Sequence, residues 1–247
     1  MITAVCRLCN RTAVLKESHI VPRFVFRFVR DDSMNQRFIE LHADEEKVVQ
    51  DGPKEYLLCD PCEQRIATYE KYFKEALHLS RHGTTIAQAG PVAIIESLDY
   101  VKTRLCLLSI LWRMSISSRW EFTNISLGDH EETIRSMILA DEAGGTDVYR
   151  MGAMIPLVNG RMEESWTAYP FAQAHSSGTI YGTLLGGILY SVYIDIVPEQ
   201  ERKAWLLQKQ GRWCMLAIDC QRIPLLMDFL RQQFGQTDIP NSTNGAV

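Results

Sequence analysis

Two closely spaced cysteine pairs constrain this sequence more than any other feature. Cys6 and Cys9 form the first pair, and Cys59 and Cys62 form the second, each with two residues between the cysteines. This spacing lets the chain turn back so that both sulfurs face one point, and two such turns supply the four thiolates of a closed tetrahedral zinc shell. The pattern predicts a structural zinc ion that fastens the fold and leaves chemistry to other residues. The alternative is four unrelated buried or free cysteines.

The cysteine count favours metal binding over disulfide bonds. The chain has seven cysteines, an odd number, and its first residues lack the basic and long apolar regions of a signal peptide. We therefore expect a cytoplasmic protein in which Cys106, Cys214 and Cys220 are core thiols. The most apolar run, residues 183–194, is too short to span a bilayer as a helix, so we predict a buried strand and no membrane contact.

The pattern of apolar residues predicts an α+β protein in two parts. Residues 1–90 are expected to form a zinc module: a hairpin around the first cysteine pair, an insertion between the pairs, and a helix that follows the second pair. Residues 91–236 are expected to form a larger α+β domain, and residues 237–247 a flexible tail. In the larger domain we expect helices, then mainly antiparallel strands; the ranges are 92–117, 128–140 and 223–234 for helices and 154–158, 179–185, 188–197 and 213–218 for strands.

Basic residues are concentrated near the start of the chain. Residues 1–37 carry seven Arg or Lys against three acids, a local charge of +4 that leaves −8 for the rest, since the net charge is −4. Within this segment, Arg23, Arg27 and Arg30 follow Pro22 at i, i+4 and i+7, which places them on one face of a predicted helix. We interpret this stripe as a phosphate-facing ridge that binds nucleic acid; the alternative is a solvated helix face.

His19 and Glu63 are the candidate catalytic residues. Metal-dependent hydrolysis of a phosphodiester needs a neutral imidazole that takes a proton from water and hard ligands that hold a divalent ion. One zinc ion would bring the segment of His19 and the helix of Glu63 together. An ion held by Glu63 would be Mg²⁺ or Mn²⁺, and the carboxylate would then point toward the space near the His19 ring. The alternative is an acidic residue favoured by the helix dipole.

These motifs resemble the HNH endonuclease family, whose zinc-bearing members have a treble-clef or ββα-metal fold. The resemblance lies in the two Cys-x-x-Cys pairs, in Ser-His-Ile-Val-Pro at 18–22 and in Leu-Leu-Cys-x-x-Cys-Glu at 57–63, and it covers residues 1–75. It implies that the four cysteines of the pairs hold the structural zinc, that His19 is the general base, and that Glu63 binds the catalytic ion. Residues 50–56 and 111–115 also resemble bacterial proteins related to this family, which supports the fold alone.

Two departures from the family pattern bear on function. Ser18 stands where the family has a metal-binding Asp or His, and residues 52–56 contain no obvious match for the Asn that orients the base. Glu17 shares a strand face with His19 and could supply a carboxylate in a variant site.

The resemblance implies a divalent-metal-dependent endonuclease that hydrolyses nucleic-acid phosphodiester bonds. We expect DNA rather than RNA as its partner, and a protein partner or regulatory ligand could act through residues 91–236. The departures favour the alternative, a catalytically inactive zinc module that binds nucleic acid or protein.

Three further residues are of a type that could bind metal. Glu70 lies about 10.5 Å along the helix from Glu63, too far to share one ion easily, so we favour a salt bridge with Lys74. His78 and His82 have the i, i+4 spacing of a metal pair without an evident third ligand, and the alternative is a solvated helix end.

Overall fold

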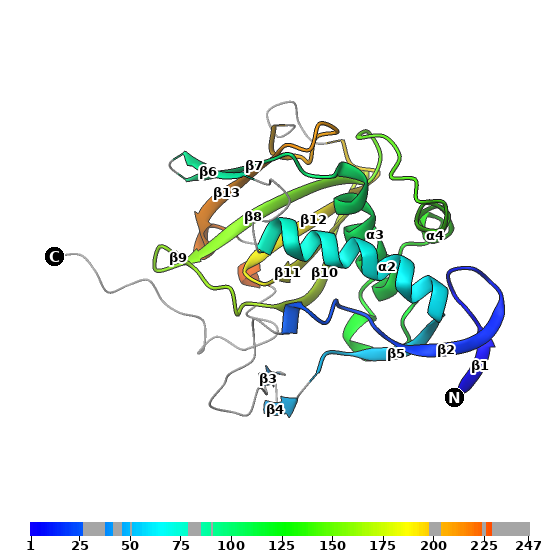
Figure 1. Ribbon diagram of the computed structural model, residues 1–247. Helices are drawn as coiled ribbons and strands as arrows, with labels where there is room; N and C mark the ends of the chain where they lie inside the picture. The colour runs from blue at the N-terminus through cyan, green and yellow to red at the C-terminus, as the bar shows by residue number, and fades with distance from the viewer. Residues whose placement is uncertain are drawn as a thin grey trace.

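The described part of the chain contains a small sheet and a large sheet, with helices packed against them, and a separate two-stranded hairpin (Figure 1). The computed structural model describes residues 1–26, 38–41, 46–49, 51–78, 85–89, 91–197, 204–223 and 226–228. Helices and strands both contribute substantially, so the predicted α+β class is confirmed. No helix among these residues is long and apolar enough to cross a membrane.

The small sheet is built around the two cysteine pairs. Its strands are β1 (Ile2–Val5), β2 (Thr12–His19) and β5 (Lys54–Cys59), all antiparallel in the order β1-β2-β5. Helix α2 (Asp60–Phe73) follows β5 directly, with Pro61 in its first turn and acidic Asp60 and Glu63 where the helix dipole favours negative charge. A short π-helical segment, Lys74–His78, extends α2. The insertion between the pairs contains a separate hairpin of β3 (Phe38–Leu41) and β4 (Glu46–Val49).

The large sheet has eight strands in the order β10-β11-β12-β8-β13-β7-β6, with β9 paired to β8. All neighbours are antiparallel except β13 and β8, which run parallel. Four of these strands match the predicted ones. The bounds are β6 (Thr85–Ala89), β7 (Val92–Glu96), β8 (Arg150–Val158), β9 (Arg161–Met162), β10 (Ala168–His175), β11 (Gly178–Leu185), β12 (Ile188–Ile194) and β13 (Trp213–Asp219).

Helix α3 (Tyr100–Ile116) is the centre of the fold. It is buried around almost its whole circumference, as expected of a helix that is apolar on every side. It packs against α2 and against α4 (His130–Ala140), and Figure 1 shows α2 and α3 beside each other along the large sheet. Two short 3₁₀ helices, Trp120–Phe122 and Cys220–Arg222, lie in connections.

One hydrophobic core joins the cysteine-rich segment to the large sheet. It includes Cys6 and Leu58 from the small sheet, Phe73 from α2, and Tyr190 and Trp213 from the large sheet. The rings of Phe73 and Tyr190 lie 5.3 Å apart between centroids. The predicted domain boundary, between residues 90 and 91, falls in the turn of the β6–β7 hairpin, and both of its strands belong to the large sheet.

The predicted helix over 92–117 is wrong at its start. Residues Val92–Glu96 form β7, and α3 begins only at Tyr100. The β-branched Val92, Ile94 and Ile95 favour a strand, and their apolar side chains mimicked the helical spacing of the residues that follow. Asp99 separates the two elements because its side chain caps α3 by accepting a hydrogen bond from the Lys102 N–H at 3.0 Å.

This cap generates a stability prediction. Replacing Asp99 by Ala should lower the free energy of unfolding by about 1 kcal/mol, because a helix N–H loses its acceptor. The matched control is Asp129→Ala, since Asp129 occupies the same position before α4 but its side chain makes no capping hydrogen bond. Urea unfolding measures both; equal losses in the two variants would contradict the role of the cap.

Candidate metal centre and active site

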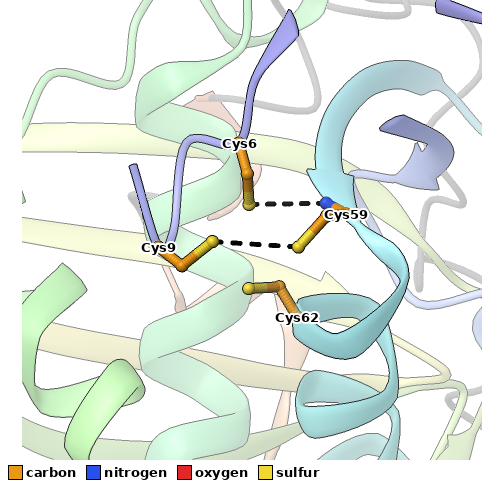
Figure 2. A group of neighbouring side chains, drawn as sticks. All are labelled: Cys6, Cys9, Cys59 and Cys62. Atoms are coloured by element: carbon orange, nitrogen blue, oxygen red, sulfur yellow. Dashed lines mark hydrogen bonds between the residues drawn. The ribbon is translucent and has the colours of Figure 1, made fainter. Parts of the chain in front are cut away.

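The four cysteines of the two pairs meet at one point (Figure 2). Cys6 and Cys9 lie in the turn after β1, Cys59 ends β5, and Cys62 lies in the first turn of α2. All four sulfurs lie within 4.8 Å of one another, and those of Cys9 and Cys59 are 3.8 Å apart. Zinc–sulfur bonds of about 2.3 Å in a regular tetrahedron would separate the sulfurs by about 3.8 Å. The cluster could therefore hold a zinc ion.

The surroundings of the cluster shift the pKa values of its thiols in different directions. Burial raises the pKa of Cys62 and of Cys59. Burial also raises the pKa of Cys9, but hydrogen bonds from Arg11 outweigh it and bring that pKa down to about 6. Because the thiolate is the form that binds metal, Cys9 is prepared for coordination at neutral pH.

Helix α4 supports the first cysteine turn from outside. The Arg135 guanidinium donates to the carbonyl of Leu8, between the two cysteines of the pair, and is itself held by Glu132. All seven cysteines of the chain are free thiols; Cys106 and Cys220 are buried, as expected of core residues, and Cys214 is half-buried.

Ser18 and Glu63 form a hydrogen-bonded pair between β2 and α2. The Ser18 hydroxyl donates to Oε1 of Glu63. Ser18 is 1% exposed, whereas Glu63 is half-buried at the start of α2. The Glu63 carboxylate is thus directed to Ser18, the residue next to His19, whereas the ring of His19 is paired with the carboxylate of Asp51. The two positions that the HNH resemblance assigns to the catalytic ion touch each other.

His19, at the end of β2, is held by a carboxylate from the insertion. Its Nε2 lies 2.9 Å from Oδ1 of Asp51, and the Nζ of Lys54 lies 2.7 Å from the other oxygen, Oδ2. Burial raises the pKa of Asp51, but hydrogen bonds from Lys54 and His19 outweigh it and lower this pKa to about 2. Asp51 is therefore ionised at neutral pH. A carboxylate only accepts, so Nε2 of His19 carries hydrogen, and in the neutral ring Nδ1 is left as an acceptor.

The backbone that carries His19 is fixed on both sides of one peptide group. The N–H of Ile20 donates to the carbonyl of Pro53 at 3.0 Å, and the His19 carbonyl accepts from Nη1 of Arg113 at 2.6 Å. Nearby, the carboxylate of Glu55 accepts from the hydroxyls of Ser117 and Ser118, both at 2.7 Å, which ties β5 to the end of α3.

The arginine stripe and Glu70 are the next predicted site residues to place in the structure. Arg23 is exposed in a turn, while Arg27 and Arg30 lie outside the described residues, so the stripe stays a prediction. The expected salt bridge of Glu70 with Lys74 is wrong: Glu70 pairs with Arg113, which reaches it from α3.

The histidine pair also differs from expectation. His78 packs against the rings of Phe24 and Phe73, with centroids 5.5 and 6.1 Å away, rather than at a solvated helix end, and His82 lies outside the described residues. Burial lowers the pKa of His78 to about 4, which keeps this ring neutral at physiological pH.

Sequence reasoning missed Asp51 and Arg113. The sequence pattern marks Asp51 only as a turn residue before Gly52 and Pro53, and it offers no residue to orient the base; Glu17 is a candidate only as a carboxylate for the metal ion. Because Lys54 lies opposite His19 in the β2–β5 register, a carboxylate three residues earlier can extend past the strand end to the ring. That register could have identified Asp51, whereas no local signal identifies Arg113.

Comparison of the chain with family models, with curated proteins and with solved structures found no match.

Proposed function

We propose that the protein is a zinc-bearing endonuclease that uses a divalent metal ion to hydrolyse phosphodiester bonds, with DNA as the preferred substrate. One observation carries the proposal: neighbouring residues at the end of β2 take part in two separate polar pairs, Ser18 with Glu63 and His19 with Asp51. The first pair offers hard oxygen ligands and the second an oriented imidazole. A module in which zinc has only a structural role needs neither the oxygen ligands nor the oriented imidazole.

The zinc ion is proposed to be structural. Cys6, Cys9, Cys59 and Cys62 would fill a tetrahedral shell and leave no open position for substrate, which is typical of structural zinc. Its contribution is to hold the turn after β1 against the β5–α2 junction, and so to place β2 beside α2.

The catalytic ion is proposed to bind at Glu63 and Ser18. The donors are a carboxylate and a hydroxyl, which suit Mg²⁺ or Mn²⁺, and these ions often use one or two protein carboxylates with water in the remaining positions. Bound there, the ion would supply Lewis-acid stabilisation of charge on the phosphate. Glu63 would then bind the ion as a strong ligand without the second one, an Asp or His, that the family has at the position of Ser18.

His19 is proposed to be the general base. With Nε2 bonded to Asp51, the Nδ1 of the neutral ring carries the lone pair that would accept a proton from water. The ionised Asp51 fixes the tautomer of the ring and stabilises the imidazolium that forms when the proton arrives. The His19 side chain is 21% exposed, so solvent and substrate can reach it.

The zinc proposal predicts the metal content of the protein. Purified protein should carry about one zinc per chain, and Cys62→Ser should release it and increase hydrogen exchange in residues 1–26 and 51–78, because a structural zinc supplies folding energy directly. Cys214→Ser, outside the cluster, is the control and should keep the metal. Folded wild-type protein without metal in elemental analysis would contradict the proposal.

The catalytic proposal predicts a pattern of activity. Wild-type protein should nick plasmid DNA when Mg²⁺ or Mn²⁺ is added and not when both are omitted; omission is preferable to EDTA, which would also remove zinc. His19→Ala should lower the rate by about 100-fold or more, since general base catalysis contributes 10²–10⁴-fold. Glu63→Gln should abolish cleavage while leaving the zinc content and thermal stability nearly unchanged.

Exposed residues of the same kinds provide the controls. His175→Ala and Glu164→Gln should keep full activity, because both side chains are exposed on the large-sheet region. If wild type and His19→Ala are equally active or equally silent on DNA and RNA, the inactive zinc module becomes the better account.

The arginine stripe predicts how DNA binding responds to salt. Replacing Arg23, Arg27 and Arg30 together by Gln should weaken binding and lower the slope of log K against log salt by about 0.7–0.9 for each phosphate group that the variant no longer neutralises. Titrations by fluorescence anisotropy at several salt concentrations measure this slope. A matched triple change of exposed basic residues elsewhere should leave it unchanged: Arg161→Gln, Lys209→Gln and Arg212→Gln. An unchanged slope in the variant of Arg23, Arg27 and Arg30 would indicate that these side chains face solvent and do not contact phosphate groups.

A further inference from the structure

Arg113 is a buried cation whose hydrogen bonds lead to the candidate active site. It lies near the end of α3, and its side chain is 2% exposed. Nη1 donates to the carbonyl of His19 at 2.6 Å, Nη2 pairs with Oε1 of Glu70, and Nε donates to the Ser109 carbonyl at 3.2 Å. The guanidinium therefore connects α3 to α2 and to the end of β2.

The hydrogen bond from Arg113 to the His19 carbonyl restrains the backbone directly at the candidate base. The adjoining N–H of Ile20 is already held by the Pro53 carbonyl, so the peptide group after His19 is fixed through both its oxygen and its nitrogen. These two hydrogen bonds fix the backbone from which the His19 side chain extends toward Asp51. A planar guanidinium suits this task because its donors lie in a rigid fork, whereas an ammonium is a single point charge.

We propose that Arg113 is a positioning residue through which the large α+β region sets the place of the His19 ring. This inference rests on the proposed function of His19. It means that residues 1–90 do not contain the whole site, because the side chain that fixes the base comes from α3. The zinc cluster and Arg113 then have separate tasks: the cluster places β2 beside α2, and Arg113 sets the last residue of β2.

A second buried arginine on the same helix provides a matched control. Arg104 is 2% exposed, and its guanidinium donates to the hydroxyl of Tyr100 at 3.0 Å and to the carbonyl of Val148. It resembles Arg113 in burial and in binding a backbone carbonyl, but none of its hydrogen bonds in the described part of the chain goes to the small sheet. A merely structural role predicts similar consequences for changing either arginine.

The experiment compares Arg113→Lys with Arg104→Lys in the full chain with its zinc. Lysine keeps the charge beside Glu70 but cannot reproduce the fork that also holds the His19 carbonyl. We expect kcat for DNA cleavage to fall by about 100-fold in Arg113→Lys, because a misplacement of about 1 Å can have an effect of that size, with KM nearly unchanged. In Arg104→Lys, kcat should stay near the wild-type value even if thermal stability falls as much as it does in Arg113→Lys. Equal losses of kcat in the two variants would overturn the proposal.

A second readout separates this inference from the nuclease proposal. The ring signals of His19 in two-dimensional NMR, assigned by their loss in His19→Ala, should move in Arg113→Lys and stay in place in Arg104→Lys. If wild-type protein cleaves nothing but the His19 signals move in this pattern, the nuclease proposal fails and the positioning role stands. Unmoved His19 signals in Arg113→Lys would overturn the positioning role whatever the cleavage result.

The double variant Arg113→Gln with Glu70→Gln covers the case in which Arg113→Lys does not fold. It removes both members of the buried ion pair, so no unpaired charge is left inside the protein. The same fall in kcat and the same displacement of the His19 signals are expected. Wild-type kcat and unmoved signals in this variant would overturn the proposal.

Discussion

Four sulfurs converging on one point determine where the rest of the cysteine-rich segment lies. Cys9 and Cys59 are 50 positions apart in sequence, yet their sulfurs are 3.8 Å apart. The three-stranded sheet and α2 are small, and much of the apolar surface that they bury lies in the core shared with the large sheet. The pairing of β2 with β5 brings β2 beside the start of α2, where Ser18 contacts Glu63, and the proposed zinc ion would fasten this arrangement.

The second constraint is the core shared with the large sheet. Helix α3 is buried between the cysteine-rich segment and the eight-stranded sheet, and it contributes Arg113 to the backbone of the site. Glu55 adds a further link between β5 and the residues after α3. If His19 is the base, as proposed, it would have two structural supports: the proposed zinc ion, which is local, and the packing around α3. The hydrogen bond from Arg113 to the His19 carbonyl would then give the large region a role in the site.

The parts of the fold that could be predicted from sequence are those set by local chemistry. Cysteine spacing predicted the four-sulfur cluster, and alternation of apolar residues predicted β8, β11, β12 and β13. The helix start at 92 failed because β-branched residues in β7 and the first turns of α3 share an apolar pattern, and only Asp99 marks their boundary. Asp51, 32 positions from His19, could have been found only through the register of β2 with β5, whereas Arg113, 94 positions away, reaches His19 through tertiary packing that no local signal indicates.

Zinc X-ray absorption spectroscopy on the purified 247-residue chain shows whether the two cysteine pairs bind one ion. We expect four sulfur atoms around the zinc at about 2.3 Å, with no nitrogen or oxygen ligand. Such coordination would show that both cysteine pairs bind one ion and that the segments of Ser18 and Glu63 are joined through it. Coordination by nitrogen or oxygen, or by only two sulfurs, would show that the two cysteine pairs do not share a closed site and that zinc does not join the two segments.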